Sequence, residues 1–436
     1  MSKLRTNYKP IEVQVTAANI STDGGLLLLK QEDKRFGLTR RMASCVSETR
    51  RGEVDHTIPK MLAQRVYGIA MGWEDCNDFT ALRHDELYAL SLESTCASQP
   101  TLSRFENSVG YKDLYRMSNE LAQIFVDRYE RRPPRRIVLD IDATVDPAHG
   151  QQQFEYFNGF YGCTCYLPLL VFGSCDGAPM EILAAVLRPG NVQSAKRAAA
   201  ILRRLARRLK EAFPKTKILV RGDAGFGIPE FFSACEDLGL EYLVAMQSNE
   251  VLHRLAEPLM AQARTERDRT GQTSRCIGET LYGAKSWGTK RRVIIKAEAL
   301  SGKVNSGKNK PGKDNARFVV TNLSQDPEKL YGIYCLRGES ENRIKELKLD
   351  LLADRTSCTS FTANAFRLLL HATAFALLTM VRDLLIATEM AKCTMGQIRL
   401  KLLKIAALVE RSTRRLLVRL PRGHPHVPLL LKILEV

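Results

Sequence analysis

The chain has 436 residues, enough to bury a large core and to form two or three domains. Its 65 lysines and arginines outnumber its 48 aspartates and glutamates, and the net charge of +17 exceeds what solubility needs, which indicates a polyanionic partner such as nucleic acid. The eleven cysteines lack zinc-ligand spacing and Met1–Lys9 is polar and basic, so the sequence argues against a zinc protein and a secretory signal, and we expect reduced cytosolic thiols.

Residues 1–130 predict a mostly helical amino-terminal region after an extended start. Helical periodicity covers Ile58–Gly72, and a second helical run follows near residues 78–92. Another helix start is expected within Gln99–Arg104, with Thr101 as the cap and Arg104 in the first turns. This short helix is either the reading helix of a helix-turn-helix, with Arg104 against DNA, or an ordinary helix of the domain.

A change of pattern at Arg131–Arg136, where two prolines interrupt any helix, marks the start of a different region. Hydrophobic runs predict strands that include Ile137–Asp142, Lys217–Arg221 and Tyr242–Met246, and helices separate the later strands. Strands first, followed by alternating helix and strand, predict an α/β fold with a mixed sheet and flanking helices.

The pattern loosens between residues 251 and 325, which we interpret as a β-rich insertion containing an exposed loop at Ser301–Asn315. A long apolar helix is expected from Ser360 to Ala391. Its most apolar run, Leu368–Val381, is too short to span a bilayer and predicts a buried helix. The remaining residues, 392–436, predict a basic helical tail.

Acidic residues end two of the predicted strands. Alternation places Asp140 and Asp142 on the same side of one strand, about 6.6 Å apart. Asp223 follows another short strand, and the carboxyl ends of strands are where sites gather in open α/β sheets. Together with a third acid, Glu341, they form a set of hard oxygen ligands that suits Mg²⁺. The alternative for each strand-end aspartate is a structural cap or turn residue.

Glu341 belongs to a stretch, Tyr334–Lys348, whose periodicity predicts one helix. Its polar stripe carries a single acid among bases, while apolar residues including Leu336 lie on a neighbouring stripe. The polar stripe consists of Tyr334, Arg337, Glu341, Lys345 and Lys348. By itself this pattern is also typical of a solvated surface helix with ion pairs four residues apart.

Three motifs combine into one resemblance. Asp-x-Thr at Asp142–Thr144, Gly-Asp-x-Gly-Phe at Gly222–Phe226 and the Tyr-Arg-Glu-Lys spacing within Tyr334–Lys348 resemble bacterial insertion-sequence transposases of the DDE type, closest to the thirteen-eighty insertion-sequence family. The resemblance implies an RNase H-like fold. It also implies that Asp142, Asp223 and Glu341 are catalytic and bind two Mg²⁺ ions, for which Mn²⁺ can substitute.

The resemblance also implies how DNA is handled. The protein would bind the terminal inverted repeats of an insertion sequence, cleave the element ends and join them to target DNA by two-metal phosphoryl transfer. The DNA contacts that we predict are Arg104, Trp287, Tyr334, Arg337, Lys345 and Lys348. Trp287 either stacks on a flipped base or is a core tryptophan. Asp142 carries the motif context, and Asp140 stays the alternative metal ligand.

The predicted organisation assigns a role to each part of the chain. The parts are 1–130 (helical, DNA-binding), 131–250 and 326–391 (two parts of the catalytic domain), 251–325 (β-rich insertion) and 392–436 (basic helical tail). We expect double-stranded DNA as partner, a homodimer in a synaptic complex, no membrane contact, and a cytoplasmic, nucleoid-associated location. Two alternatives stay open: an RNase H-type Mg²⁺-dependent nuclease without strand transfer, and a non-catalytic, transposase-derived repressor.

Overall fold

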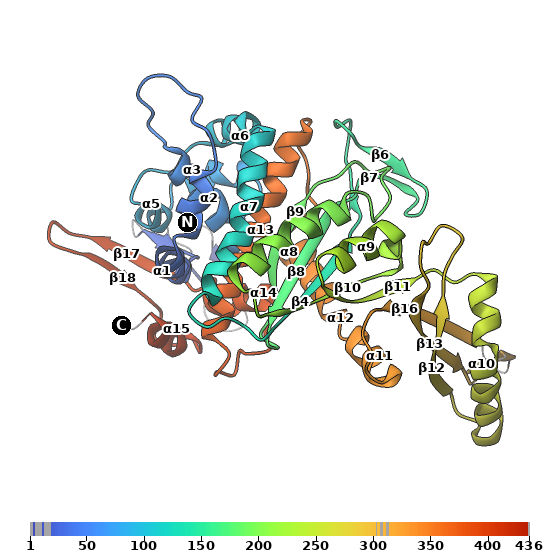
Figure 1. Ribbon diagram of the computed structural model, residues 1–436. Helices are drawn as coiled ribbons and strands as arrows, with labels where there is room; N and C mark the ends of the chain where they lie inside the picture. Colours follow the sequence, from blue (N-terminus) through green and yellow to red (C-terminus); the bar gives the residue numbers. More distant parts are fainter. Residues whose placement is uncertain are drawn as a thin grey trace. The chain divides into compact units, whose positions relative to one another are not determined.

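The computed structural model describes residues 3–4, 11–12, 19–301, 303–305, 308–310 and 314–434. Its elements form two compact units (Figure 1). The first unit comprises Met1–Ser44, Glu48–Glu106 and Leu377–Val436, and the second comprises Cys45–Ser47 and Asn107–Ala376. The five-part division by role stays a prediction, because compactness alone does not assign roles.

An eight-stranded mixed sheet forms the centre of the second unit. The strands, in spatial order, are β12 (Ser274–Tyr282), β13 (Arg291–Ala299), β16 (Asp314–Thr321), β11 (Glu241–Met246), β10 (Lys217–Gly222), β4 (Arg136–Ala143), β8 (Leu169–Cys175) and β9 (Glu181–Val186). Strands β4, β10 and β11 run parallel to one another, and the other neighbours pair antiparallel. The predicted α/β class with a mixed sheet is confirmed, and this sheet is consistent with an RNase H-like fold.

Apolar and acidic side chains of β4 alternate as expected, and helices cover the apolar face of the sheet. Ile137, Leu139 and Ile141 enter a core cluster with apolar side chains of three helices. These helices are α7 (Tyr111–Tyr129), α8 (Ala198–Ala212) and α9 (Pro229–Asp237). On the other face Val138 packs with Leu330 of α11 (Pro327–Cys335), so Asp140 and Asp142 also face that side. The acids therefore point away from the larger core.

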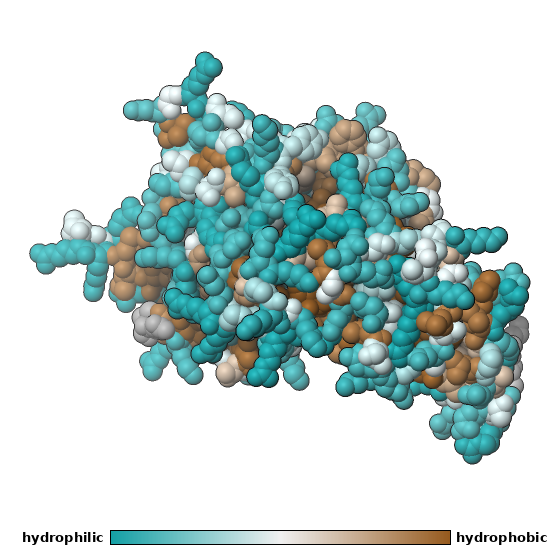
Figure 2. Space-filling model, viewed as in Figure 1, coloured by the Kyte–Doolittle hydropathy of each residue, from teal (hydrophilic) through white to brown (hydrophobic). Residues whose placement is uncertain are grey.

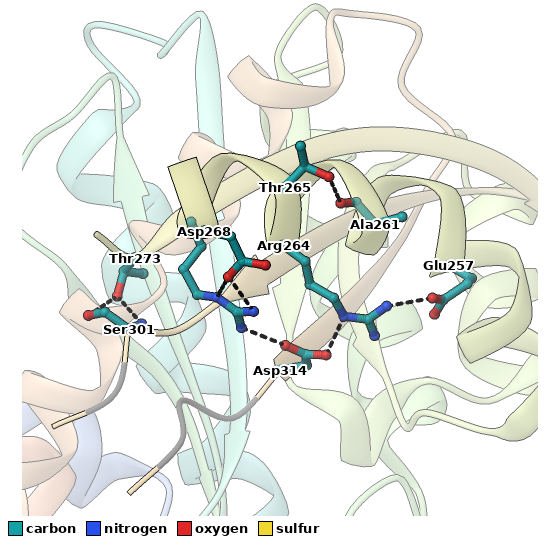
Figure 3. A network of polar contacts seen from close by, with 9 residues as sticks. Glu257, Ala261, Arg264, Thr265, Asp268, Thr273, Ser301 and Asp314 are labelled. Carbon is teal, nitrogen blue, oxygen red and sulfur yellow. Dashed lines mark hydrogen bonds and ion pairs between the residues drawn. The ribbon is translucent and has the colours of Figure 1, made fainter. Parts of the chain in front are cut away.

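The segment that we interpreted as a β-rich insertion begins with a long helix, α10 (Glu250–Thr270). Arg264 of this helix binds Glu257 at 2.6 Å and Asp314 of β16 at 2.7 Å (Figure 3). The sequence did not predict α10, because Pro258 interrupts its periodicity. Strands β12, β13 and β16 continue the central sheet through β11 rather than forming a sheet of their own. Parts of the expected loop Ser301–Asn315 lie outside the described residues.

Short helices make up most of the first unit. They are α1 (Leu26–Phe36), α2 (Leu38–Ser44), α3 (Ile58–Met71), α4 (Phe79–Leu82), α5 (Glu86–Leu92) and the start of α6 (Gln99–Ser108). The prediction of a cap at Thr101 is wrong, because α6 begins at Gln99 and Leu102 already donates to the carbonyl of Ser98 at 3.0 Å. Pro100 is tolerated there, since the first turn of a helix needs no backbone donor at that position.

The basic tail was predicted to be helical, but it contains a β-hairpin. Strands β17 (Ala407–Arg411) and β18 (Leu416–Arg419) pair antiparallel, and β17 also pairs with β3 (Ile20–Ser21). The residues between the strands form a turn, and the strands themselves carry Val409 and Val418, which favour extended backbone. Helices α14 (Met395–Ile398) and α15 (Val427–Ile433) flank the hairpin.

Helix α13 (Phe361–Leu384) corresponds to the predicted long apolar helix. By length and composition it could cross a membrane, but its apolar window is entirely buried in the protein. Phe375 of this helix packs edge-on against Phe172 of β8 at 5.8 Å. It therefore has the character of a core helix. On the face shown in Figure 2, hydrophilic side chains predominate and hydrophobic ones are scattered, as the charged composition leads one to expect.

Candidate active site

Two of the predicted acids meet at one edge of the central sheet. Asp142 lies near the carboxyl end of β4, and Asp223 directly follows β10. The two strands are parallel neighbours with Ile141 opposite Gly222, so the aspartates emerge side by side. Burial raises the pKa of Asp142 to about 6, and the charge of Asp223 adds to the shift. The geometry brings together two carboxylates that disfavour each other's charge.

The stretch Tyr334–Lys348 is not the single helix that we predicted. Helix α11 ends at Cys335, and α12 (Gly338–Lys345) begins after a tight turn at Leu336 and Arg337. Gly338 explains the interruption, because glycine is a poor residue for continuing a helix. Leu336, expected to pack, is 66% exposed at this turn. The consequence is that Arg337 stands at the start of α12.

Arg337 links two of the three acids. Its Nη1 donates to Asp142 Oδ2 at 2.8 Å, and its Nη2 donates to Glu341 Oε1 at 2.6 Å. Burial disfavours the charged guanidinium, but Asp142, Tyr334 and Glu341 raise the pKa of Arg337 overall. The side chain of Glu341 is half exposed, whereas Asp142 is largely buried. A single positive group thus holds the carboxylate of the strand beside that of the helix.

Asp140, the alternative ligand, is bound completely by another arginine. Arg221 of β10 donates Nε to Asp140 Oδ1 at 2.6 Å and Nη2 to Oδ2 at 2.7 Å. Arg221 also donates Nη1 to the carbonyl of Ile333 at 2.8 Å. Both side chains of the pair are buried. The two carboxylate oxygens of Asp140 therefore serve a closed ion pair one strand repeat before Asp142.

The arrangement of the acids bears on whether they can bind a metal ion. Within residues 19–301 and 314–434, no three histidine, cysteine, aspartate or glutamate side chains are placed so that they could hold an ion together. At this edge of the sheet the guanidinium of Arg337 lies between Asp142 and Glu341. The donors are nevertheless hard oxygens, and two of them bind one cationic group, the guanidinium of Arg337. Carboxylate oxygens are the ligand type that a divalent ion such as Mg²⁺ prefers.

The comparison with protein families decides the affiliation. A family model described as transposase DDE domain group 1 matches residues 4–436. The chain belongs to this family. Among solved structures, this transposase-family chain is similar to the piggyBac transposase synaptic complex with hairpin DNA, at 10% identity and a TM-score of 0.43, covering 84% of this chain and 78% of that chain. It is also similar to the Mos1 transposase paired-end complex with left transposon end, at 16% identity and a TM-score of 0.17, covering 45% and 61%. A comparison with curated proteins gave no match.

The remaining bases of the Tyr-Arg-Glu-Lys string in this DDE-domain chain have different surroundings. Lys348 donates Nζ to the carbonyl of Val145 at 2.7 Å and lies 3.7 Å from Asp354. Lys345 is exposed on α12, and Tyr334 is half-buried beside Arg337. Only Lys345 therefore presents its charge fully to solvent. The DNA contacts predicted for these residues stay predictions.

Trp287 and Arg104 lie outside this cluster of acids. The ring of Trp287 is 5.2 Å from that of Phe232 and 5.5 Å from that of Tyr282, and Arg291 lies over it at 5.3 Å. Trp287 is half-buried against the core, so these contacts agree with the interpretation as a core tryptophan. Stacking on a base stays a prediction. Arg104 is exposed on α6, and its contact with DNA likewise stays a prediction.

No role was predicted from the sequence for Tyr161 or for Asp146. Burial raises the pKa of Tyr161, and the charges of Asp142 and Asp223 raise it further. Asp146 is buried and accepts from the Thr356 hydroxyl at 3.1 Å. Burial raises the pKa of Asp146 to about 8. Neither Tyr161 nor Asp146 belongs to the three motifs, and nothing in the local sequence distinguishes Asp146.

Proposed function

We propose that the chain is an insertion-sequence transposase of the thirteen-eighty type that binds terminal inverted repeats, cleaves the element ends and joins them to target DNA. One observation carries the proposal: Asp142 and Asp223 emerge side by side from parallel strands, and Arg337 ties Glu341 to Asp142. The family membership supports the same chemistry. An isolated strand-end acid would be explained by local structure, but the placement of three acids from distant parts of the chain around one arginine, Arg337, needs another reason.

The three acids would hold the metal. Asp142, Asp223 and Glu341 would ligate two Mg²⁺ ions, or Mn²⁺ in their place. Bound ions would supply an activated water or 3′-hydroxyl and stabilise the leaving oxygen in an in-line displacement. Asp140 is unsuited, because ligation would leave the buried Arg221 without its carboxylate.

The neighbouring residues of this chain would bind and orient the DNA end. Arg337 would exchange its two carboxylates for a backbone phosphate, with which its planar guanidinium makes paired hydrogen bonds. Tyr334 would keep the guanidinium in place, and Lys345 would contact phosphate from the exposed side of α12. Lys348 would bind DNA only at the expense of its bond to Val145. A further proposed contact is Arg104 with the duplex. For Trp287, packing in the core and stacking on a flipped base stay alternatives, which its alanine variant separates.

The proposed partners are element ends and target DNA, brought together by a homodimer, in the cytoplasm on nucleoid DNA. An RNase H-type nuclease would use the same acids and cut without joining. A repressor would bind the ends without needing the acids at all. Neither alternative is favoured by a particular feature of the structure, and the products of the reaction separate them.

The test uses the purified full-length chain, end-labelled DNA carrying the inverted repeat, and Mg²⁺. The expected result is cut and joined product from the wild type. Asp142→Asn, Asp223→Asn and Glu341→Gln should each bind the end DNA but give no cutting, because ion binding needs the charge and end binding does not. Cutting without joining would support the nuclease, and binding without any cutting would support the repressor. Cutting by all three variants would refute the metal mechanism.

A further inference from the structure

The first unit contains a two-stranded ribbon made of β17, β18 and the turn between them. It was not expected, because a helical tail was predicted for this part of the chain. Its register pairs Leu408 with Arg419 and Arg411 with Leu416. At the turn the Ser412 amide donates to the Arg415 carbonyl at 2.9 Å. We call this segment, Ala407–Arg419, the basic ribbon.

Only the base of the basic ribbon is joined to a further strand. Ala407 and Leu408 pair with β3, and the Val409 amide donates to the Asn19 carbonyl at 2.9 Å. Beyond these residues, the strands pair only with each other within the part of the chain that the structure describes. Figure 1 shows the hairpin extending beyond the helices of its own unit. Every residue from Glu410 to Leu416, the outer half of the ribbon, is exposed.

Positive charge concentrates at this outer half. Arg411, Arg414 and Arg415 are all exposed, and none of their guanidinium groups has an ion pair or hydrogen bond within the described residues. The acid of the ribbon, Glu410, pairs with Arg419 at 3.0 Å. In Figure 2 the same hairpin ends in hydrophilic side chains. Three like charges at one turn repel each other and do not stabilise the hairpin, so their presence points to an external anion.

We propose that the basic ribbon enters the major groove of duplex DNA, with Arg411, Arg414 and Arg415 contacting phosphates along its walls. The B-form major groove admits a two-stranded β-ribbon, whereas the major groove of duplex RNA is too deep and narrow for side chains. Arginine suits phosphate because its fork donates paired hydrogen bonds. The inference rests on the proposed function for the choice of DNA, and it adds a contact on the unit that does not contain the acids.

The test compares two triple variants of the full-length chain that lose the same charge. One is Arg411→Gln, Arg414→Gln, Arg415→Gln in the ribbon. The other is Arg131→Gln, Arg132→Gln, Arg135→Gln, which removes three exposed arginines from another turn. Binding of inverted-repeat duplex is measured at several salt concentrations. The ribbon variant should lose at least about tenfold in affinity. The slope of log affinity against log salt concentration should become shallower by about 2–3, as expected when three phosphate contacts are lost.

The control triple variant should change the affinity less than about threefold, and duplex RNA should compete poorly with DNA. A third variant with lysines at the same three ribbon positions should retain most of the salt slope. Unchanged melting temperatures ensure that lost binding is not lost folding. The proposal is overturned if the ribbon variant binds like the wild type, if both glutamine variants weaken binding equally, or if duplex RNA competes as well as DNA. DNA cutting by the wild type is measured in parallel. If the wild type does not cut, the proposed function is refuted, but a loss of binding specific to the ribbon variant would still support the ribbon proposal.

Discussion

Two acid–arginine pairs lie one strand repeat apart on β4, and they differ in how completely they are closed. Asp140 uses both oxygens on Arg221, and the two side chains are 0% and 4% exposed. Asp142 shares Arg337 with the half-exposed Glu341, and Arg337 itself is 14% exposed. We call Asp140 with Arg221 the closed pair, because each carboxylate oxygen is bound by one buried arginine. We call Asp142 with Arg337 the open pair, because its arginine is shared with a half-exposed carboxylate.

The largest difference should appear when each aspartate is replaced by asparagine. Asp142→Asn should reduce Mg²⁺-dependent cutting to background with little loss of stability. Asp140→Asn should keep measurable cutting but lose about 3–5 kcal/mol of unfolding free energy, because Arg221 stays buried without its anion. Cutting assays and denaturant unfolding check both. If Asp140→Asn is inactive at full stability while Asp142→Asn cuts normally, the assignment of open and closed pairs is reversed.

Replacing Arg337 tests whether the open pair competes with an ion. Arg337→Ala should melt at a lower temperature than the wild type without metal, because Asp142 and Glu341 lose their shared counter-charge. Added Mg²⁺ should then raise the melting temperature more in the variant than in the wild type, since no guanidinium has to be displaced. Arg343→Ala, which removes another arginine of α12, is the matched control. Equal metal-induced shifts in the wild type and Arg337→Ala would show that Arg337 does not compete.

Asp146 extends the comparison to an acid that pairs with no arginine among the residues that the structure describes. Its folded pKa of about 8 lies well above the value of about 3.9 expected in the unfolded chain. The folded protein then retains a proton that the unfolded chain has released, so stability is full below about pH 4 and falls as the pH rises towards 8. Asp146→Asn should remove this part of the fall. Unfolding free energies of both proteins between pH 4 and 9 check it, and parallel curves would contradict the buried, protonated state.

Trp287 packs against the arginine of a third ion pair, Arg291 with Glu236. In this pair the arginine is buried and the glutamate is partly exposed. Trp287→Ala should lower stability modestly through lost packing and reduce all activities in proportion. Binding of duplex, end cleavage and melting temperature are compared in the same preparation. A selective loss of cleavage or joining, with binding and stability retained, would instead support stacking on an extruded base.

The sequence predicted those features that depend on local pattern. Alternation in Ile137–Asp142 placed both aspartates on one side of β4, and the short strand before Asp223 was recognised by its apolar residues. The closure of the two pairs was not predictable, because Arg337 reaches Asp142 across 195 positions of the chain. Helix α10 was missed because Pro258 obscures its periodicity. The β-ribbon was predicted to be a helix, because it contains leucines and arginines, which are good helix formers.

The guanidinium shared by Asp142 and Glu341 has a consequence for the order in which ligands load. A phosphate that draws Arg337 away frees both carboxylates at once, so DNA and divalent ion should bind with positive cooperativity. Linkage then requires the ion to tighten the hold on the DNA end by the same factor. Away from an element end, the resting protein would carry its own counter-charge and bind free Mg²⁺ weakly, which would keep the nuclease chemistry confined to its substrate.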